Sequence, residues 1–179
     1  MRSNSQVATI RRGRPDDAAA YCKCVAAVAQ ERKYLVTVEG FSLEETRSFL
    51  QAIEARGSPC TVATADGVLI GWCDIIPKTA RGFTHVGTLG VGLAWEFRGQ
   101  GIGRRLLIEC LSQAREIGLE RIELVVYSDN PRAIHLYESL GFLHEGRKVQ
   151  ARKIDGYHQD ELLMALRFQV APGASWPSK

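Results

Sequence analysis

A glycine-rich segment in the middle of the chain has the residue types and spacing that bind phosphate groups. It runs Arg98–Gly103, with the sequence RGQGIG, and a helical pattern of apolar residues follows at once. The first turn of a helix carries unpaired backbone N–H groups and a partial positive charge. Glycines let the backbone approach a ligand closely. The segment therefore predicts a phosphate cradle at a helix N-terminus.

Three classes of phosphate cradle can be compared with this segment. A nucleoside-triphosphate loop ends in Gly-Lys-Ser/Thr, but here Gly103 precedes Arg104 and Arg105. The dinucleotide fingerprint has a different glycine spacing and follows an early strand. The pattern Arg/Gln-x-x-Gly-x-Gly/Ala, which holds the pyrophosphate of coenzyme A, is matched by Arg98, Gly101 and Gly103. The loop alone leaves a plain strand-to-helix turn as the alternative.

A second segment, downstream, places polar side chains on one face of a helix. Asn130, Ala133 and Tyr137 are spaced i, i+3 and i+7. Asn130 followed by Pro131 predicts the helix start. The face carries an amide, a small residue and a phenol, so it can border a ligand channel. The alternative is that Tyr137 is an ordinary tyrosine of an amphipathic helix.

The strand expected just before the glycine loop can contribute backbone groups to the same site. Residues 84–93 contain three glycines, at positions 87, 90 and 92. A thioester ligand beside such a strand can bond its free backbone groups, as an added strand would. Glycines there permit close approach or a bulge.

Periodicity and turn residues predict the elements that position these groups. The expected order is βααβββαβαββ, an α+β fold with a mixed central sheet and helices on both faces. A strand–helix–strand unit over 84–127 predicts a parallel pair, and its second strand, 121–127, reads as buried on both faces. The strands are expected over 7–12, 61–64, 68–76, 84–93, 121–127, 143–153 and 159–168, and the helices over 16–30, 42–56, 102–117 and 130–140.

Bulk composition bounds the class of protein. The chain has 179 residues, 45% hydrophobic and 24% charged, which predicts a single domain over 1–170. Residues 171–179 are rich in Pro, Gly and Ser and predict a flexible tail. The net charge of +3 comes without a Lys/Arg block, which argues against a nucleic-acid partner. With no membrane-length apolar run and no signal-peptide core, we expect a cytoplasmic protein. The five cysteines read as free thiols, and we expect no metal site.

Together these segments resemble the GNAT superfamily of acyl-CoA N-acyltransferases, over residues 7–168 and most densely over 89–142. The resemblance implies an acetyl-CoA site between strands 84–93 and 121–127, with Tyr137 as general acid. It also implies a set of cofactor-binding residues: Val91 and Leu93 for the acetyl-pantetheine arm, Arg98, Gly99, Gln100, Gly101, Ile102, Gly103 and Arg104 for the pyrophosphate, and Asn130 and Ala133 beside the arm.

The general base is the uncertain part of the mechanism. In enzymes of this superfamily that acetylate ribosomal-protein N-termini, a glutamate stands five residues before the motif asparagine, and here that residue is Val125. Glu31 is the first candidate, with Asp74 and His85 as alternatives. Glu31 lies where the segment between the first two helices commonly caps the acceptor pocket.

The resemblance is strongest to the branch that acts on small amines and amino acids, and Tyr34 and Leu35 are expected to line the acceptor pocket. We therefore expect transfer of an acetyl group from acetyl-CoA to a primary amine of a small molecule, an amino acid or a polyamine-like compound. A homodimer is plausible by resemblance. Two alternatives stay open: a protein N-terminal or lysine acetyltransferase, and an acyl-CoA-binding module without catalysis. The acyl group can also exceed acetyl.

Overall fold

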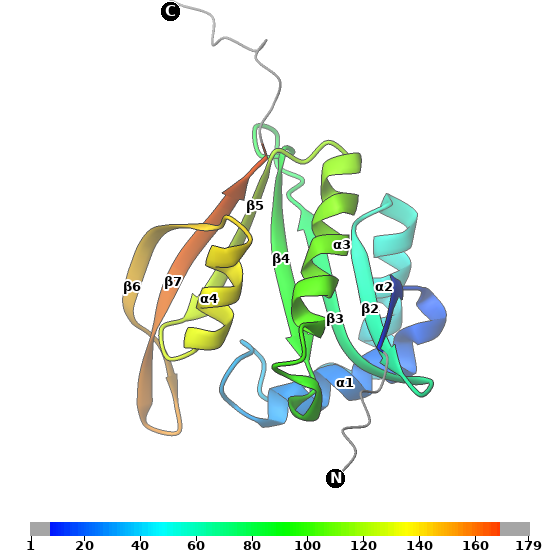
Figure 1. Ribbon diagram of the computed structural model, residues 1–179, viewed down its shortest axis with the longest axis horizontal. Coiled ribbons are helices and arrows are strands. Elements are labelled where there is room, and N and C mark those ends of the chain that lie inside the picture. Colours follow the sequence, from blue (N-terminus) through cyan, green and yellow to red (C-terminus); the bar gives the residue numbers. More distant parts are fainter. Residues whose placement is uncertain (1–7, 169–179) are drawn as a thin grey trace, which may run out of the picture.

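The computed structural model describes residues 8–168, and its element order confirms the predicted βααβββαβαββ (Figure 1). The predicted tail over 171–179 lies outside the described residues. The strands are β1 (Thr9–Arg12), β2 (Cys60–Ala65), β3 (Val68–Pro77), β4 (Val86–Leu93), β5 (Arg121–Tyr127), β6 (Leu143–Ile154) and β7 (Tyr157–Arg167); the helices are α1 (Ala18–Gln30), α2 (Leu43–Arg56), α3 (Ile102–Glu116) and α4 (Pro131–Ser139), with the short 3-10 turns η1 (Pro15–Asp17) and η2 (Trp95–Phe97).

Local sequence signals set the ends of α2. The Ser42 hydroxyl accepts a hydrogen bond from the Glu45 N–H, and the Glu45 carboxylate accepts one from the Ser42 N–H, so the predicted capping box forms. Such a cap contributes about 1 kcal/mol. Gly57 ends the helix at φ 62°, in the left-handed region that favours glycine.

The seven strands form one mixed sheet in the order β1-β2-β3-β4-β5-β7-β6. The pairing of β4 with β5 is parallel, and the other five pairings are antiparallel. Helix α3 makes the crossover between β4 and β5, as a parallel pair requires. The predicted strand–helix–strand unit is thus confirmed.

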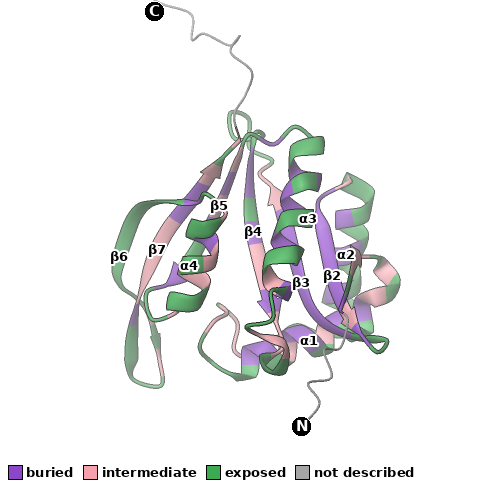
Figure 2. Cartoon of the chain, in the orientation of Figure 1, coloured by how far each residue is buried: buried purple, intermediate pink, exposed green. Residues whose placement is uncertain are grey.

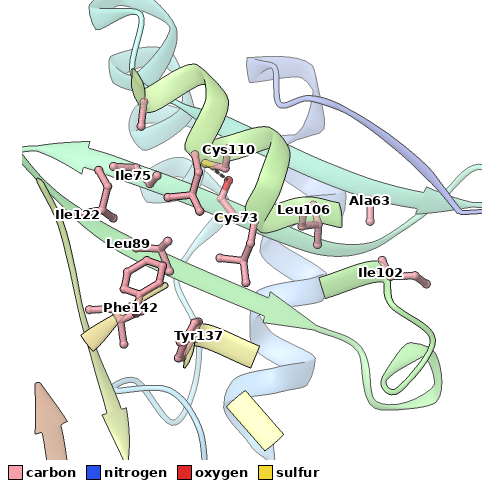
Figure 3. Packing of buried hydrophobic residues seen from close by; sticks show 14 of the residues in the cluster. Ala63, Cys73, Ile75, Leu89, Ile102, Leu106, Cys110, Ile122, Tyr137 and Phe142 are labelled. Carbon is pink, nitrogen blue, oxygen red and sulfur yellow. Dashed lines mark hydrogen bonds between the residues drawn. The ribbon is translucent and has the colours of Figure 1, made fainter. Parts of the chain in front are cut away.

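Each face of the sheet has its own core, and helices cover both faces as predicted (Figures 1 and 2). Helices α1 and α2 pack on one face with Trp72 and Val62. Helix α3 packs on the other face, where α4 adds Tyr137 beside Phe142 (Figure 3). The Cys110 thiol lies 3.5 Å from the carbonyl oxygen of Cys73 in this second core.

The prediction that β5 is buried on both faces is wrong. Ile122, Leu124 and Val126 belong to the α3 and α4 core, but Val125 points to the opposite face and is 51% exposed. The core on that face is built by residues of α1, α2, β2 and β3, and it does not extend to β5. This face of β5 therefore borders solvent beside β4.

Two absences hold for residues 8–168. None of the helices there is long and apolar enough to span a membrane. Within the same residues, no group of three His, Cys, Asp or Glu side chains is arranged to hold a metal ion.

Candidate active site

The parallel strands β4 and β5 pair only at their beginnings. Val86, Gly87 and Thr88 pair with β5, and the pairing ends there, although β4 continues to Leu93 and β5 to Tyr127. Beyond Thr88 the two strands diverge toward the lower end of the sheet (Figure 1). We call this opening, between residues 89–93 of β4 and 124–127 of β5, the slot.

The backbone of β4 presents free groups to the slot. The Ala94 N–H donates to the Ile70 carbonyl of β3 at 2.8 Å. In an antiparallel pair the hydrogen-bonded residues alternate, so the backbone groups of residues 92, 90 and 88 also point toward β3. Val91 and Leu93, which alternate with those residues, direct their N–H and C=O groups toward β5. The two residues that the sequence predicted for the acetyl-pantetheine arm therefore face the slot with their backbone.

The glycine loop lies where β4 leads into α3. Gly101 is the N-cap of α3 at φ 78°, and Gly99 has φ 79°, a conformation that other residues adopt only at a cost. Nothing lies within 4 Å of the position a Cβ would take at Gly101. The N–H groups at the start of α3 are thus reachable from outside. The local geometry fits the predicted pyrophosphate cradle.

Basic side chains surround this cradle. A guanidinium nitrogen of Arg132, from α4, lies 4.0 Å from the position a Cβ would take at Gly99. Arg104 donates to the Ser139 hydroxyl at 2.8 Å and is exposed. Ile102, in contrast, is buried in the core, so only its backbone can contact a ligand. Gln100 donates to the Glu96 carbonyl.

The side chain of Arg98 does not do what the motif predicted. Its Nε donates to the Leu93 carbonyl at 2.8 Å, and its two terminal nitrogens bind the Glu31 carboxylate at 2.7 and 2.5 Å. The guanidinium also lies 4.9 Å from the centre of the Tyr34 ring. With all these contacts made inside the protein, Arg98 fastens the cofactor loop to the segment that follows α1 rather than reaching toward a phosphate.

This arrangement also changes the interpretation of Glu31 and Tyr34. Both Glu31 oxygens are engaged by Arg98, so the carboxylate is held in an ion pair with the guanidinium. Tyr34 covers the same guanidinium. Leu35 packs against the α1 and α2 core. These three residues organise the segment over 31–42, which joins α1 to α2.

The β6–β7 hairpin holds the same segment from the other side. Arg152 donates to the carbonyls of Arg32 and Lys33, both at 3.4 Å, and of Leu35 at 2.9 Å. Its guanidinium lies 4.7 Å from the centre of the Tyr127 ring, at the end of β5. At the hairpin tip, Asp155 accepts two hydrogen bonds from Arg32, at 2.8 and 2.7 Å. These hydrogen bonds therefore hold the segment 31–42 across the end of the sheet at which the slot opens.

Helix α4 provides the other wall. The Asn130 side chain accepts a hydrogen bond from the Ala133 N–H at 3.3 Å, so Asn130 is the N-cap as predicted. Its amide NH₂ makes no hydrogen bond within residues 8–168 and is available to a ligand. Ala133 is half-buried.

Tyr137 lies at the inner side of α4. Its ring packs 5.7 Å from that of Phe142, and burial raises the pKa of its hydroxyl well above the usual value (Figure 3). The hydroxyl therefore stays protonated. It makes no hydrogen bond to any of the described residues. It is nevertheless not one of the fully enclosed side-chain oxygens that lack a hydrogen-bond partner, because the described residues contain none. The hydroxyl is thus free to donate a hydrogen bond to a group that enters the slot.

A buried carboxylate lies on the opposite face of the sheet. Asp74 on β3 is 8% exposed and accepts a hydrogen bond from the Tyr21 hydroxyl of α1 at 2.9 Å. Burial raises the pKa of Asp74 to about 7, although the Tyr21 hydrogen bond acts to lower it. His85, the other alternative base, is exposed and precedes β4 at the closed end of the β4–β5 pair. Asp74 is the better placed of the two.

An open pocket of about 610 Å³ lies on the same face as Asp74. Ile76 and Thr88, which pair across β3 and β4, are among its lining residues, together with Arg56 and Phe83. The Ile76–Thr88 pair is the next pair on this face after Asp74–Gly90. Neither Asp74 nor Gly90 is among its lining residues.

A comparison with models of protein families identifies the family of this chain. The model described as "Acetyltransferase (GNAT) family" matches residues 27–142, which include β4, the glycine loop and α4. The chain belongs to the GNAT acetyltransferase family. The resemblance inferred from the glycine loop and Tyr137 is therefore confirmed.

Individual GNAT relatives agree with this assignment. The L-amino acid N-acyltransferase MnaT of Escherichia coli is 27% identical over 67% of this chain and 70% of its own length. A mycothiol acetyltransferase of Propionibacterium freudenreichii is 38% identical over 42% of this chain, a match that spans only 24% of that relative. The solved structure of a GNAT acetyltransferase from Streptococcus pneumoniae has a TM-score of 0.85 and 26% identity, and the match covers 90% of this chain and all of that one.

Two residues of the site were not found from the sequence. Arg132 is an arginine in an ordinary polar context, and only the fold brings it to the glycine loop. Tyr21 lies in an Ala-rich helix that gives no sign of a partner 53 residues away. A helical-wheel analysis of α1 would have placed Tyr21 on the buried face, but not against Asp74.

Proposed function

We propose that this protein transfers the acetyl group of acetyl-CoA to a primary amine of a small molecule. The observation that carries the proposal is the slot, where β4 and β5 no longer pair. Strand β4 then leads through the glycine loop to the accessible N-terminus of α3. A cofactor with a pyrophosphate at one end and an extended arm at the other needs both features side by side. The GNAT family membership supports the same conclusion.

The site residues fit acetyl-CoA as follows. The N–H groups at the start of α3, with Arg104 and Arg132 nearby, bind the pyrophosphate. The arm lies along β4 and bonds to the free backbone groups of Val91 and Leu93, as an added strand would. The Leu93 carbonyl already accepts from Arg98, so Val91 supplies the stronger share.

The residues of the slot have defined tasks in the transfer. The Val91 N–H can donate to the thioester oxygen as negative charge develops on it. The Tyr137 hydroxyl donates a hydrogen bond to the leaving sulfur. Because the raised pKa keeps this hydroxyl protonated, stabilisation of the thiolate by hydrogen bonding is its main task.

The closed form of the acceptor side supports a small acceptor. A polypeptide acceptor needs an open groove, but the Arg152 and Asp155 contacts hold the hairpin against the segment 31–42. The amino acid acceptor named for MnaT is consistent with this reading. We therefore favour an amino acid or polyamine-like amine over a protein N-terminus.

The test is a turnover screen with the purified full chain. Release of the free coenzyme A thiol is followed with amino acids, polyamines, aminoglycosides and short peptides, and the products are identified by mass. We expect turnover with at least one small amine and none with acetyl-CoA alone. Binding of acetyl-CoA without thiol release across the whole panel would instead indicate a binding module. Light scattering of the same sample tests the expected homodimer.

A further inference from the structure

We propose that Asp74 accepts the proton that the incoming ammonium group must lose before it attacks the thioester. This inference rests on the proposed acetyl transfer and goes beyond it, since it names the group that makes the amine nucleophilic. It also replaces Glu31, whose carboxylate is bound by Arg98.

The position of Asp74 in the sheet is the first argument. Asp74 pairs with Gly90, just beyond the point where β4 leaves β5. A Cβ at Gly90 would lie 3.2 Å from one Asp74 oxygen, so only a glycine leaves the space beside the carboxylate free. Gly90 is half-buried and Thr88 is exposed on the same face. A group that enters the slot beside Gly90 can therefore come within reach of the carboxylate.

The reacting groups fall on the two sides of one strand. The backbone of Val91, next in sequence to Gly90, faces the slot where the thioester is expected. The amine approaches on the α1 and α2 face, from the side bordered by the segment 31–42. Asp74 thus lies next to the place where the nitrogen and the thioester carbon must meet.

The surroundings of Asp74 are those of a proton acceptor rather than of an ion pair. Tyr21 on α1 holds one oxygen, Cys60 on β2 and Cys73 on β3 are the nearby thiols, and β4 contributes only Gly90. All four neighbours are neutral. With a pKa of about 7, the carboxylate is half ionised near neutral pH and can both take up and release a proton.

Glu123, the carboxylate of β5, is already paired with cations. Glu123 on β5 accepts from Lys78 at 2.5 Å and from Arg121 at 2.8 Å. These contacts lower the pKa of Glu123. An ion-paired carboxylate of lowered pKa holds a proton poorly, which leaves Asp74 as the better acceptor.

The step balances as follows. The Asp74 carboxylate takes one proton from the ammonium group, and the free amine forms a C–N bond to the thioester carbon. The C–S bond then breaks and the sulfur leaves as a thiolate hydrogen-bonded to the Tyr137 hydroxyl. The nitrogen loses its second proton, and this proton converts the thiolate to the free thiol. Asp74 afterwards releases its proton to solvent past Gly90. No oxidant, reductant or metal is needed.

The experiment measures pH profiles of kcat/KM for the wild type and three variants, with two acceptors of different amine pKa. We expect the acidic limb of the wild type near pH 7 with both acceptors. Asp74→Asn should lower kcat/KM at pH 7 by about 100-fold or more and abolish that limb. Tyr21→Phe removes a hydrogen bond that lowers the Asp74 pKa, so its limb should move to higher pH. The exposed Asp16→Asn is the matched control and should leave the profile unchanged.

The outcomes separate this inference from the proposed function. No turnover by the wild type with any amine refutes both. Turnover that Asp74→Asn reduces less than about 3-fold refutes the role of Asp74 alone. So does an acidic limb that follows the pKa of the acceptor, because the amine then enters already deprotonated. Acetyl-CoA affinity of Asp74→Asn, measured by calorimetry, should match the wild type; a parallel loss of cofactor binding would overturn the assignment.

Discussion

The substitution Asp74→Asn should make the free energy of unfolding less dependent on pH between about pH 4 and 7, while it slows the reaction. In the unfolded chain Asp74 ionises at its ordinary pKa of 3.8, whereas in the folded protein its pKa is about 7. Between these values the folded state holds one proton more than the unfolded state. The free energy of unfolding of the wild type therefore falls as the pH rises through this window.

The size of the effect follows from the same two pKa values. One proton of difference changes the free energy of unfolding by about 1.36 kcal/mol per pH unit. From pH 5 to pH 8, of which the last unit contributes little, the wild type should lose about 2–3 kcal/mol relative to Asp74→Asn. For a chain of this length, that corresponds to about 5–10 °C in Tm.

Urea unfolding and thermal scans at pH 5, 6, 7 and 8 measure the effect. The informative quantity is the pH dependence of the difference between the two proteins, because a constant offset from burying an amide cancels. Asp16→Asn, at an exposed position, should track the wild type at every pH. A difference between wild type and Asp74→Asn that stays within about 0.5 kcal/mol across the range would mean that Asp74 ionises normally, and the reasoning would be refuted.

Three further substitutions test other parts of the site. Tyr137→Phe should lower kcat by at least about 10-fold with little change in acetyl-CoA affinity, since it removes only the hydrogen bond to the leaving sulfur; unchanged kcat excludes Tyr137 from the reaction. Gly101→Ala forces a side chain into a left-handed conformation and should cost about 1–2 kcal/mol of stability and weaken acetyl-CoA binding, as calorimetry can measure. Arg152→Met removes the contacts to the segment 31–42, so hydrogen exchange there should speed up and the acceptor KM should rise, whereas Lys153→Met, the neighbouring control, should change neither.

Much of the fold follows from short-range signals. The capping box at Ser42, the helical periodicity of α3 and the Asn130–Pro131 helix start each determine a local conformation, and these elements lie where the sequence indicates. The burial of β5 does not follow in the same way. Its apolar run has no period that reveals exposure at Val125, because that depends on how far α1 and α2 extend over the sheet.

The features of the site show the same difference between local and long-range signals. Backbone features, such as the glycine loop and the free edge at Val91, follow from residue type and spacing. Side-chain partners do not: Arg98 and Glu31 are 67 residues apart, and neither position predicts their mutual ion pair. Asp74 was one candidate among several, and only its burial and its place opposite Gly90 distinguish it.

The slot has a consequence for the order in which the cofactor and the amine bind and leave. The sheet separates its two faces, and the slot lies between β4 and β5 where their pairing has ended. In the proposed reaction the cofactor enters beside α3 and α4, while the amine enters beside the segment 31–42 on the other face. Because the two substrates use different entrances, bound acetyl-CoA does not block the amine and the bound amine does not block acetyl-CoA. In the proposed reaction each can therefore bind or leave while the other stays bound. Acetyl transfer then needs no covalent relay through the protein, because the two reactants meet directly across one strand.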